Sequence, residues 1–379
     1  MKILQIANFA PERNVGTPGT IMDLGDALTA AGQEVSYVWR GAPPSPWGQN
    51  FSRFIEVPRR QLHQARTALA QARYDVVLVH QPHGYSIFEQ LAPQYPKTLF
   101  LNFSHGWELC SPSYTPPNAG VVRKIKDRLS AALTRQHCER AAQFANGVIV
   151  LNRLDAEFLI QQQNVPREKI CVLPLGLDPQ LLLQPIRPAA AAGQPARFLF
   201  TGNYVAQKGI EILETALLAL ASDGVNFSYT CVTHTDQHAG MQQRLGPHLD
   251  TRLNLLGWQP REALIPLYHN HDFLLFPSRY EGFGKVAHEA MACGLPVVGA
   301  RVGVLADRAI HQENALLSPP GDLEQFLANL RQAAAAPQLA NLYGPRARTA
   351  VSGDTWAGVA KSFLSFVEQR QKQKASAAN

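Results

Sequence analysis

The chain has 379 residues, of which 46% are hydrophobic and 17% charged, with a net charge of +6 at pH 7. This composition is typical of a globular rather than a disordered protein, and the length predicts two domains of about 180 residues each. No 18 apolar residues run together, the N-terminal apolar run is too short for a signal peptide, and the five cysteines lack C-x-x-C spacing. We therefore expect no membrane-spanning helix, signal peptide, disulfide framework or zinc site.

The first half alternates strand-like and helical segments. Buried-strand patterns occur at residues 3–7, 35–39, 76–80, 99–102 and 148–151. The intervening segments, such as 21–31 and 60–72, have apolar residues at helical spacing. Strands that alternate with helices form a parallel sheet covered on both faces. Residues 1–183 are therefore predicted to be a doubly wound α/β domain.

Positive charge is concentrated in this first half. Residues 1–195 hold 19 Lys and Arg against 14 Asp and Glu, whereas residues 196–379 hold 16 against 15. Apolar residues at helical spacing within residues 122–140 predict an amphipathic helix with a basic face. The cations of this face are Arg123, Lys124, Lys126, Arg128, Arg135 and Arg140. Solvation and contact with anionic lipid headgroups both remain open for it, while the lack of a nucleic-acid-binding motif predicts no nucleic-acid partner.

Residues 184–195 carry three prolines and no apolar periodicity, which predicts an interdomain linker. A second series of strand-like runs follows at 198–201, 227–232, 253–255, 273–276 and 297–299 and predicts a second α/β domain over residues 196–353. Residues 354–379 predict a C-terminal helix with a basic tail. The expected fold class is thus α/β, with two Rossmann-like domains facing a central cleft, because such sheets bind ligands at the carboxyl ends of their strands.

Two acidic residues follow the strand predicted at 273–276. Glu281 lies in a glycine-rich turn, and Glu289 lies about five residues into the next helix, roughly 7–8 Å further along its axis at about 1.5 Å per residue. Two carboxylates so placed can hold two ends of one extended polar ligand. Gly282 and Gly284 let backbone N–H groups and the positive helix end approach an anion. A nucleotide sugar is a ligand of this kind.

The two acidic residues and the glycine-rich turn also allow other interpretations. An acidic residue before a helix is often only a cap, and one within a helix often faces solvent. Residues 282–287 also match the dinucleotide pattern G-x-G-x-x-A, with Asp307 at the spacing of a ribose-binding acid. That pattern usually opens a domain, but here it lies late in the second series of strands, so hydride transfer is the weaker hypothesis.

Taken whole, residues 277–298 resemble the E-x7-E signature of the retaining family 4 glycosyltransferases, the glycosyl transferases group 1, which have the GT-B fold. Further motifs of that family occur in its order along the chain, at residues 104–106, 173–178, 202–209 and 313–322. The resemblance covers roughly residues 1–350 and is strongest between 170 and 322. It names a superfamily but not a substrate, and it implies that the C-terminal helix of residues 354–379 crosses back to the first domain.

The resemblance implies that Glu281 binds the hydroxyls of the donor sugar and Glu289 the ribose of the nucleotide. The residues predicted around the donor are Gly16, Gly202, Asn203, Lys208, Gly282, Phe283, Gly284 and Lys285. Many relatives carry an apolar residue at the position of Lys285, for which simple exposure to solvent is the alternative interpretation. Lys208 ends a loop and precedes a helix, where a cation and N–H groups can meet a diphosphate. Relatives commonly have Arg where this chain has Asn203. A clamp rewired through another cation such as Lys285, a weaker donor site and a degenerate enzyme all remain open.

His105 follows the fourth strand at its carboxyl end, where a ligand contact is favoured over a structural role, and the resemblance places it against the donor sugar. Gly16 belongs to a glycine loop whose bare backbone would let acceptor and diphosphate come close. The histidine pairs 80/83 and 234/238 have metal-like spacing but no convincing further ligands. We interpret them as non-metal residues, with His83 a candidate for the acceptor site.

No D-x-D occurs in the chain. Metal-dependent sugar transfer usually relies on such a pair, so the sequence predicts transfer without a metal site or a cofactor. The donor expected for such an enzyme is a UDP-sugar or GDP-sugar. Charge on the leaving diphosphate would be met by Lys208, a second cation and a helix N-terminus. Catalysis would rest on His105, Glu281 and Lys208.

The sequence hypothesis is a retaining hexosyltransferase that works in surface polysaccharide or glycolipid synthesis, with a glycan or lipid-linked acceptor. It would act in the cytoplasm, either in solution or on the inner face of the membrane. Two alternatives stay open: a GT-B nucleotide-sugar epimerase, which needs no acceptor, and an inactive nucleotide-sugar-binding protein.

Overall fold

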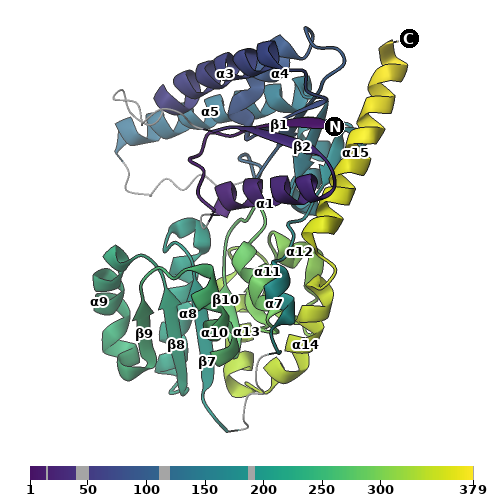
Figure 1. Ribbon diagram of the computed structural model, residues 1–379. Helices are drawn as coiled ribbons and strands as arrows, with labels where there is room; N and C mark the ends of the chain where they lie inside the picture. The colour runs from purple at the N-terminus through teal and green to yellow at the C-terminus, as the bar shows by residue number, and fades with distance from the viewer. Residues whose placement is uncertain (14–15, 40–50, 111–119, 187–192, 379) are drawn as a thin grey trace. The chain divides into compact units, whose positions relative to one another are not determined.

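The computed structural model describes residues 1–13, 16–39, 51–110, 120–186 and 193–378 (Figure 1). The chain divides into two compact units, Met1–Gly176 with Trp356–Asn379, and Leu177–Thr355. Each unit holds a six-stranded parallel sheet with helices on both faces, as predicted for the fold class.

The sheet of the first unit has the order β2-β1-β3-β4-β5-β6. Its strands are β1 Lys2–Ile6, β2 Glu34–Val38, β3 Val76–His80, β4 Leu99–Phe103, β5 Gly147–Val150 and β6 Ile170–Val172. Its longer helices are α1 Gly16–Ala30, α3 Val57–Gln71, α4 Tyr85–Leu91, α5 Val121–Phe144, α6 Arg153–Gln163 and α15 Trp356–Ala378. Side chains of alternate residues, such as Leu4, Val77 and Phe100, form a core on the face covered by α3, α4 and α5. The other face is covered by α1 and α15, which lie side by side (Figure 1).

The sheet of the second unit has the order β12-β11-β10-β7-β8-β9. Its strands are β7 Ala196–Thr201, β8 Phe227–Val232, β9 Leu253–Leu256, β10 Phe273–Phe276, β11 Val297–Ala300 and β12 Ala315–Ser318. Its helices are α7 Pro179–Leu183, α8 Ile210–Ser222, α9 His238–Leu249, α10 Arg261–Asn270, α11 Lys285–Ala292, α12 Val304–Arg308, α13 Leu323–Ala335 and α14 Leu339–Val351. The order reverses between β7 and β10, and such a switch point is where doubly wound sheets bind ligands.

The ten predicted strands are present with boundaries within two residues, but two strands were missed. The strand β6 has only three residues, and β12 contains only three apolar ones. Each lies at the edge of its sheet and pairs with a single neighbour. Such short segments become strands through the partner strand that the fold supplies, and this is not visible in their own pattern.

The first unit ends at Gly176 before the chain enters the second unit, whereas the predicted first domain extends to residue 183. The backbone N–H of Leu177 donates to the carbonyl of Asp354 at 2.7 Å, and Arg348 donates to the carbonyls of Leu182 and Gln184. These bonds tie α7 to the second unit. The linker expected at 184–195 lies partly outside the described residues, which omit 187–192.

The end of the chain differs from the tail that the sequence predicted. The helix α15 continues to Ala378, and two cations on it cap backbone groups of the first unit. Arg370 Nε donates to the carbonyl of Asn146 at 2.8 Å, and Lys374 Nζ donates to that of Thr98 at 2.8 Å. Burial lowers the pKa of Lys374. Both cations thus tie α15 to backbone carbonyls next to the strands of the first sheet.

Candidate functional site

The two switch-point strands of the second unit carry the predicted donor-site motifs. Lys208 follows β7, and Glu281 follows β10. Lys208 Nζ donates to Oε1 of Glu281 at 2.5 Å, and the hydroxyl of Ser278 donates to the same oxygen at 2.7 Å. Glu281 is buried and Lys208 is partly exposed. The fold therefore brings together a cation and a carboxylate that are 73 residues apart in sequence.

Glycines allow these two turns to approach one another. Gly209 has φ +69°, and a Cβ built on it would lie 2.1 Å from the carbonyl oxygen of Pro277, so the turn after Lys208 rests on the backbone that follows β10. Gly284 has φ +87° and directly precedes the first residue of α11. Non-glycine residues rarely adopt either conformation. Both predicted glycine turns thus serve to place backbone close to the Lys208–Glu281 pair.

Glu289 is the fifth residue of α11 and has partners that the sequence did not reveal. Arg261 Nε lies 3.1 Å from Oε1 of Glu289, while the same guanidinium lies 3.4 Å from Oδ2 of Asp178. The hydroxyl of Tyr268 donates to Oε2 of Glu289 at 3.5 Å. Burial, together with the charge of Glu289, holds the pKa of Tyr268 well above its usual value. Only Asp178 lay in a recognised motif, so no local signal marked Arg261 or Tyr268.

The remaining predicted donor-site residues lie on the loops around this pair. Asn203 is exposed, and its carbonyl accepts from the N–H of Val205 at 3.0 Å. Lys285 is the first residue of α11 and is partly buried. Phe283 is buried, with its ring edge-on to that of His288 at 4.9 Å. The structure therefore brings Lys208 and Glu281 into contact but does not define a second diphosphate cation.

A second cation near this edge was not anticipated. Arg279 Nε donates to Oε1 of Glu211 at 2.7 Å, and the N–H of Arg279 donates to the carbonyl of Gln207 at 2.9 Å. Its charge is therefore balanced by Glu211, next to the turn that carries Lys208.

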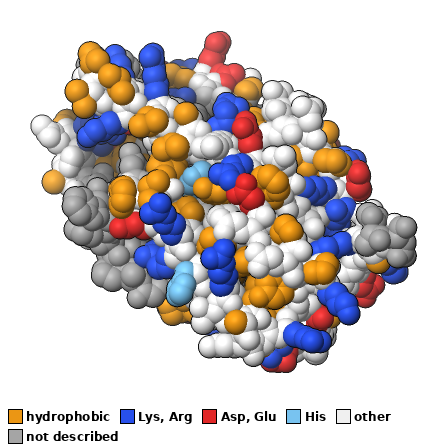
Figure 2. Space-filling model, turned by 90° about the horizontal axis from the view of Figure 1, so that it is seen from above, with side chains coloured by type: hydrophobic (Ala, Val, Ile, Leu, Met, Phe, Trp, Pro, Cys, Tyr) orange, Lys and Arg blue, Asp and Glu red, His pale blue; other side chains and the backbone are white. Residues whose placement is uncertain are grey.

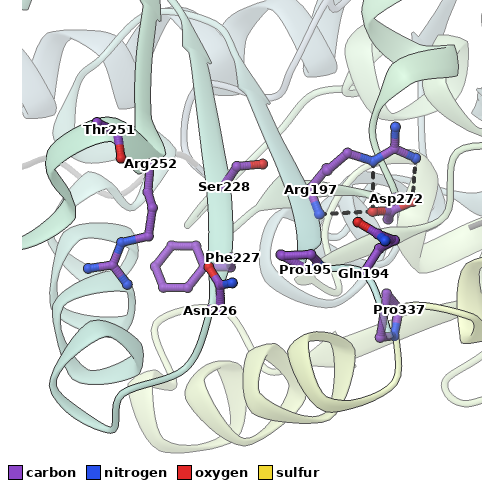
Figure 3. A pocket seen from close by; sticks show the side chains of 10 residues that line it. All are labelled: Gln194, Pro195, Arg197, Asn226, Phe227, Ser228, Thr251, Arg252, Asp272 and Pro337. Carbon is purple, nitrogen blue, oxygen red and sulfur yellow. Dashed lines mark hydrogen bonds and ion pairs between the residues drawn. The ribbon is translucent and has the colours of Figure 1, made fainter. Parts of the chain in front are cut away.

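A hollow of about 450 Å³ lies at the opposite edge of the same sheet (Figure 3). Residues at the amino ends of the strands line it, including Arg197, Phe227 and Arg252. Arg197 forms two side-chain hydrogen bonds to Asp272, at 3.1 and 2.9 Å, and Arg252 donates to three backbone carbonyls. Protein groups already pair with these two arginines, and ligands of parallel sheets bind at the carboxyl ends of the strands, whereas this hollow lies at their amino ends. We therefore do not assign a ligand to this hollow.

In the first unit the predicted histidine lies beside another histidine. His80 ends β3 and His105 follows β4, and His80 Nδ1 lies 2.9 Å from His105 Nε2. The other nitrogen of His80, Nε2, lies 2.8 Å from Oε1 of Gln5. Burial, and then the nearby His105, hold the pKa of His80 well below its ordinary value. Gly16, from the predicted glycine loop, is the first residue of α1, and residues 14–15 of that loop lie outside the described residues.

The two members of each histidine pair with metal-like spacing, His80 with His83 and His234 with His238, contact different partners. His83 Nδ1 lies 3.1 Å from His137 Nδ1, and Arg53 Nε donates to His83 Nε2 at 3.0 Å. His234 stacks on Trp258 with ring centroids 5.0 Å apart, whereas His238 lies 3.2 Å from the carbonyl of Leu256. Within the described parts of the chain, no three His, Cys, Asp or Glu side chains are grouped so that they could hold a metal ion. Among the helices that the structure describes, none combines the length and apolarity needed to cross a membrane.

Comparisons with known proteins agree with this architecture. The family model described as Glycosyl transferase 4-like domain matches residues 15–176, and that described as Glycosyl transferases group 1 matches residues 195–335. The chain is 28% identical over 242 residues to mannosylfructose-phosphate synthase of Agrobacterium fabrum, covering 59% of this chain and 53% of the relative. It is 28% identical over 243 residues to 2-deoxystreptamine glucosyltransferase of Streptomyces kanamyceticus, covering 60% of each. The first such relatives are matched over about two fifths to three fifths of their own length.

Solved structures match the whole chain. Sucrose-phosphate synthase of Thermosynechococcus elongatus superimposes with a TM-score of 0.77 at 21% identity, covering 100% of both chains. The lipopolysaccharide outer core galactosyltransferase WaaB superimposes with a TM-score of 0.74 at 16% identity, covering 98% of this chain and 100% of that one. At such identities the likeness concerns the fold. With one model matching each sheet-bearing half and the fold shared throughout, the chain belongs to the glycosyl transferases group 1 family and has the GT-B fold.

Proposed function

We propose that the protein is a metal-independent, retaining glycosyltransferase that moves a hexose from a nucleoside-diphosphate sugar to a hydroxyl acceptor. The observation that carries this proposal is the contact between Lys208 and Glu281 at the switch point of the second sheet. Glu289 lies eight residues further along, on the helix whose N-terminus follows Glu281. A cation, two carboxylates and a positive helix end are the groups that a sugar joined to a diphosphate requires.

Each residue has a distinct part in this proposal. Lys208 and the N–H groups at the start of α11 would stabilise the charge that develops on the diphosphate as its bond to the sugar breaks. Glu281 would hold sugar hydroxyls, and Glu289 would hold the ribose. A hydrolase-type carboxylate pair needs both acids beside the scissile bond, so assigning Glu289 to the ribose favours a positioning role for Glu281 over a nucleophilic one.

Ligands of structurally similar proteins support a nucleotide-sugar donor. Anabaena HepE, with a TM-score of 0.64 at 17% identity, was solved in complex with UDP and glucose. The catalytic domain of starch synthase IV of Arabidopsis thaliana, with a TM-score of 0.70 at 14% identity, was solved with ADP and acarbose. By analogy we propose a UDP- or GDP-sugar donor, used in polysaccharide or glycolipid synthesis.

Thermal-shift screening of UDP- and GDP-sugars against the purified chain tests donor binding, since a ligand at about 100 times its Kd adds roughly 2.7 kcal/mol of stability. Release of free nucleoside diphosphate is then measured with and without glycan acceptors. We expect release that depends on the acceptor. Conversion of the donor to an isomeric sugar without any acceptor would instead identify an epimerase.

The exposed Asn203 favours a second candidate function, that of a nucleotide-sugar-binding protein that does not catalyse transfer. Its position in the donor loop offers an amide where the family resemblance leads us to expect a guanidinium. An Asn203→Arg variant discriminates between the two, because it would supply the missing cation. Donor binding by wild type without turnover on any acceptor, together with turnover by the variant, would favour the binding protein.

We further propose that α5 lies on an anionic membrane surface, as a lipid-linked acceptor would require. The first turns of this helix expose four apolar side chains, each between 59% and 74% accessible: Val121, Val122, Ile125 and Leu129. They alternate with the four cations at 123, 124, 126 and 128, so the apolar residues at helical spacing are not covered by core in this part of the helix. Figure 2 shows hydrophobic and basic side chains intermixed on one face of the molecule. Such a surface suits a lipid interface, where apolar side chains enter and cations meet headgroups.

Co-sedimentation with anionic and with neutral vesicles tests this. Changing Arg123, Lys124, Lys126 and Arg128 to Gln should reduce binding to anionic vesicles, since each cation near the surface contributes about 1 kcal/mol. A control of equal charge change replaces the exposed cations Arg167, Arg301, Lys361 and Lys372 by Gln. Because apolar side chains also take part, salt should weaken binding without abolishing it. Equal sedimentation of the two variants, or no binding of wild type, would leave a soluble acceptor as the better proposal.

A further inference from the structure

A chain of hydrogen bonds crosses one face of the first sheet and ends at His105. Gln5 Nε2 donates to the carbonyl of Ile21 in α1 at 3.4 Å. Gln5 Oε1 then lies 2.8 Å from His80 Nε2, and His80 Nδ1 lies 2.9 Å from His105 Nε2. Gln5 and His80 lie on β1 and β3, the two strands where the order of this sheet reverses. Both side chains are buried.

The chemistry of the groups dictates where the protons lie. The amide of Gln5 gives its N–H₂ to a backbone carbonyl, so it presents an oxygen, an acceptor only, to His80. His80 must therefore carry its proton on Nε2. A neutral imidazole has a single N–H, which leaves Nδ1 of His80 as an acceptor for the Nε2–H of His105. The direction of donation is thus the same along the whole chain, from His105 to His80 to Gln5 to Ile21.

This arrangement requires His80 to stay neutral, and its surroundings favour that. Burial disfavours the imidazolium and lowers the pKa of His80, and the neighbouring His105 lowers it further. The packed strand β2 brings Tyr37, whose hydroxyl approaches Gly25 next to the Gln5 amide. Burial raises the pKa of Tyr37, so this group also stays neutral. A neutral amide at position 5 is the partner such a histidine needs, because a carboxylate there would stabilise the charged ring.

Ring contacts restrict His105 further. Its ring lies 5.1 Å from that of His80 at an interplanar angle of 27°, and 4.9 Å from that of Phe103 at 30°. Stacking limits the plane of the imidazole, while the bond to His80 selects which nitrogen carries the proton.

We propose that His80 and Gln5 are positioning residues that hold His105 in the Nε2–H tautomer and in one ring orientation. This inference rests on the proposed sugar transfer and on the family resemblance, which implies that His105 contacts the donor sugar. Preorganising that histidine fixes its N–H where charge develops in the transition state, so that the contact strengthens during the reaction without a cost of reorientation.

The sharpest test is Gln5→Glu, which changes the shape of the side chain little but offers a carboxylate to His80. The carboxylate should favour protonation of both His80 nitrogens, so that Nδ1 no longer accepts from His105. Turnover near neutral pH should fall about 10- to 100-fold, by analogy with the loss seen when the outer hydrogen-bond partner of a metal-bound histidine is altered. Turnover should recover at higher pH as His80 loses its extra proton. Gln94→Glu, an exposed substitution with the same charge change, should show neither effect.

A second variant separates positioning from folding. His80→Phe should lower kcat while leaving the affinity for free nucleoside diphosphate unchanged, because Lys208, Glu289 and the start of α11, which are proposed to hold that ligand, lie in the second unit. The control is His271→Phe, which removes a buried histidine that lies 2.6 Å from the Leu267 carbonyl and 2.8 Å from the Thr230 hydroxyl. This control should lower the free energy of unfolding by about as much as His80→Phe does, but it should leave kcat unchanged.

Nitrogen-15 NMR of histidine-labelled full chain provides a readout independent of substrate. We expect an Nε2–H tautomer at His105 in wild type, and a doubly protonated His80 at neutral pH in Gln5→Glu. An Nδ1–H tautomer at His105, or a His80 that remains neutral in the variant, would overturn the proposal. A wild-type chain without any transferase activity would count against the proposed function, and these spectra would still decide the tautomer.

Discussion

The Lys208–Glu281 contact makes a quantitative prediction for stability. Glu281 is 10% and Lys208 28% exposed at the side chain, and their charged atoms are 2.5 Å apart. In Lys208→Met the Ser278 hydroxyl would still donate to Oε1 of this carboxylate, but the charged donor would be lost. Hydrogen bonds to charged groups contribute on the order of 1.5–3 kcal/mol, and partial exposure of Lys208 favours the lower half of that range. We therefore expect a coupling free energy of about 2 kcal/mol between the two side chains.

A double-mutant cycle with Lys208→Met, Glu281→Gln and the double variant measures this coupling by urea unfolding. The control cycle uses the exposed pair Arg331 and Asp223 of the same unit, with charged atoms 2.7 Å apart and side chains 51% and 42% exposed. An exposed pair should couple by less than about 1 kcal/mol. If Lys208 and Glu281 are additive within about 0.5 kcal/mol, the reasoning about this site is wrong.

The same variants connect stability with chemistry. Lys208→Met should lower turnover about 100-fold, the scale of removing a donor that stabilises transition-state charge. Arg331→Gln should leave turnover unchanged. Full turnover in Lys208→Met would show that another group meets the charge of the diphosphate.

Three further predictions address the nucleotide, the metal and pH. Glu289→Ala should weaken binding of free nucleoside diphosphate by about 1.5–3 kcal/mol in calorimetry, whereas Glu281→Ala chiefly lowers turnover; an unchanged affinity in Glu289→Ala would contradict the ribose assignment. Activity should survive EDTA, and a full loss that magnesium or manganese restores would refute metal independence. Burial, and then the neighbouring His83, lower the pKa of His137 to about 4, so the unfolded chain takes up a proton first as pH falls from about 6.5. Wild type should therefore lose stability between pH 6.5 and 4, and His137→Phe should lose less; equal shifts of the urea midpoint would argue against this.

Much of the fold follows from local pattern. The run at 76–79 is apolar and mostly β-branched, and such runs alternating with amphipathic helices predict an α/β fold with a parallel sheet. The same pattern locates the helix of residues 121–144 but not its environment. Its first turns expose their apolar side chains, because burial depends on whether another element packs there and not on the spacing along the helix itself.

The sequence by itself determined the fold class, the family and the positions of Lys208, Glu281, Glu289 and His105, because each follows a strand or a glycine turn that the local pattern reveals. Only the tertiary structure decided their partners. Arg261 of α10 reaches Glu289 of α11. Lys208 reaches Glu281, and Gln5 with His80 reaches His105, across strands that are adjacent in their sheets but distant in sequence. The physical reason is that a hydrogen-bond partner is selected by strand order, and strand order is a property of the folded sheet that no local periodicity encodes.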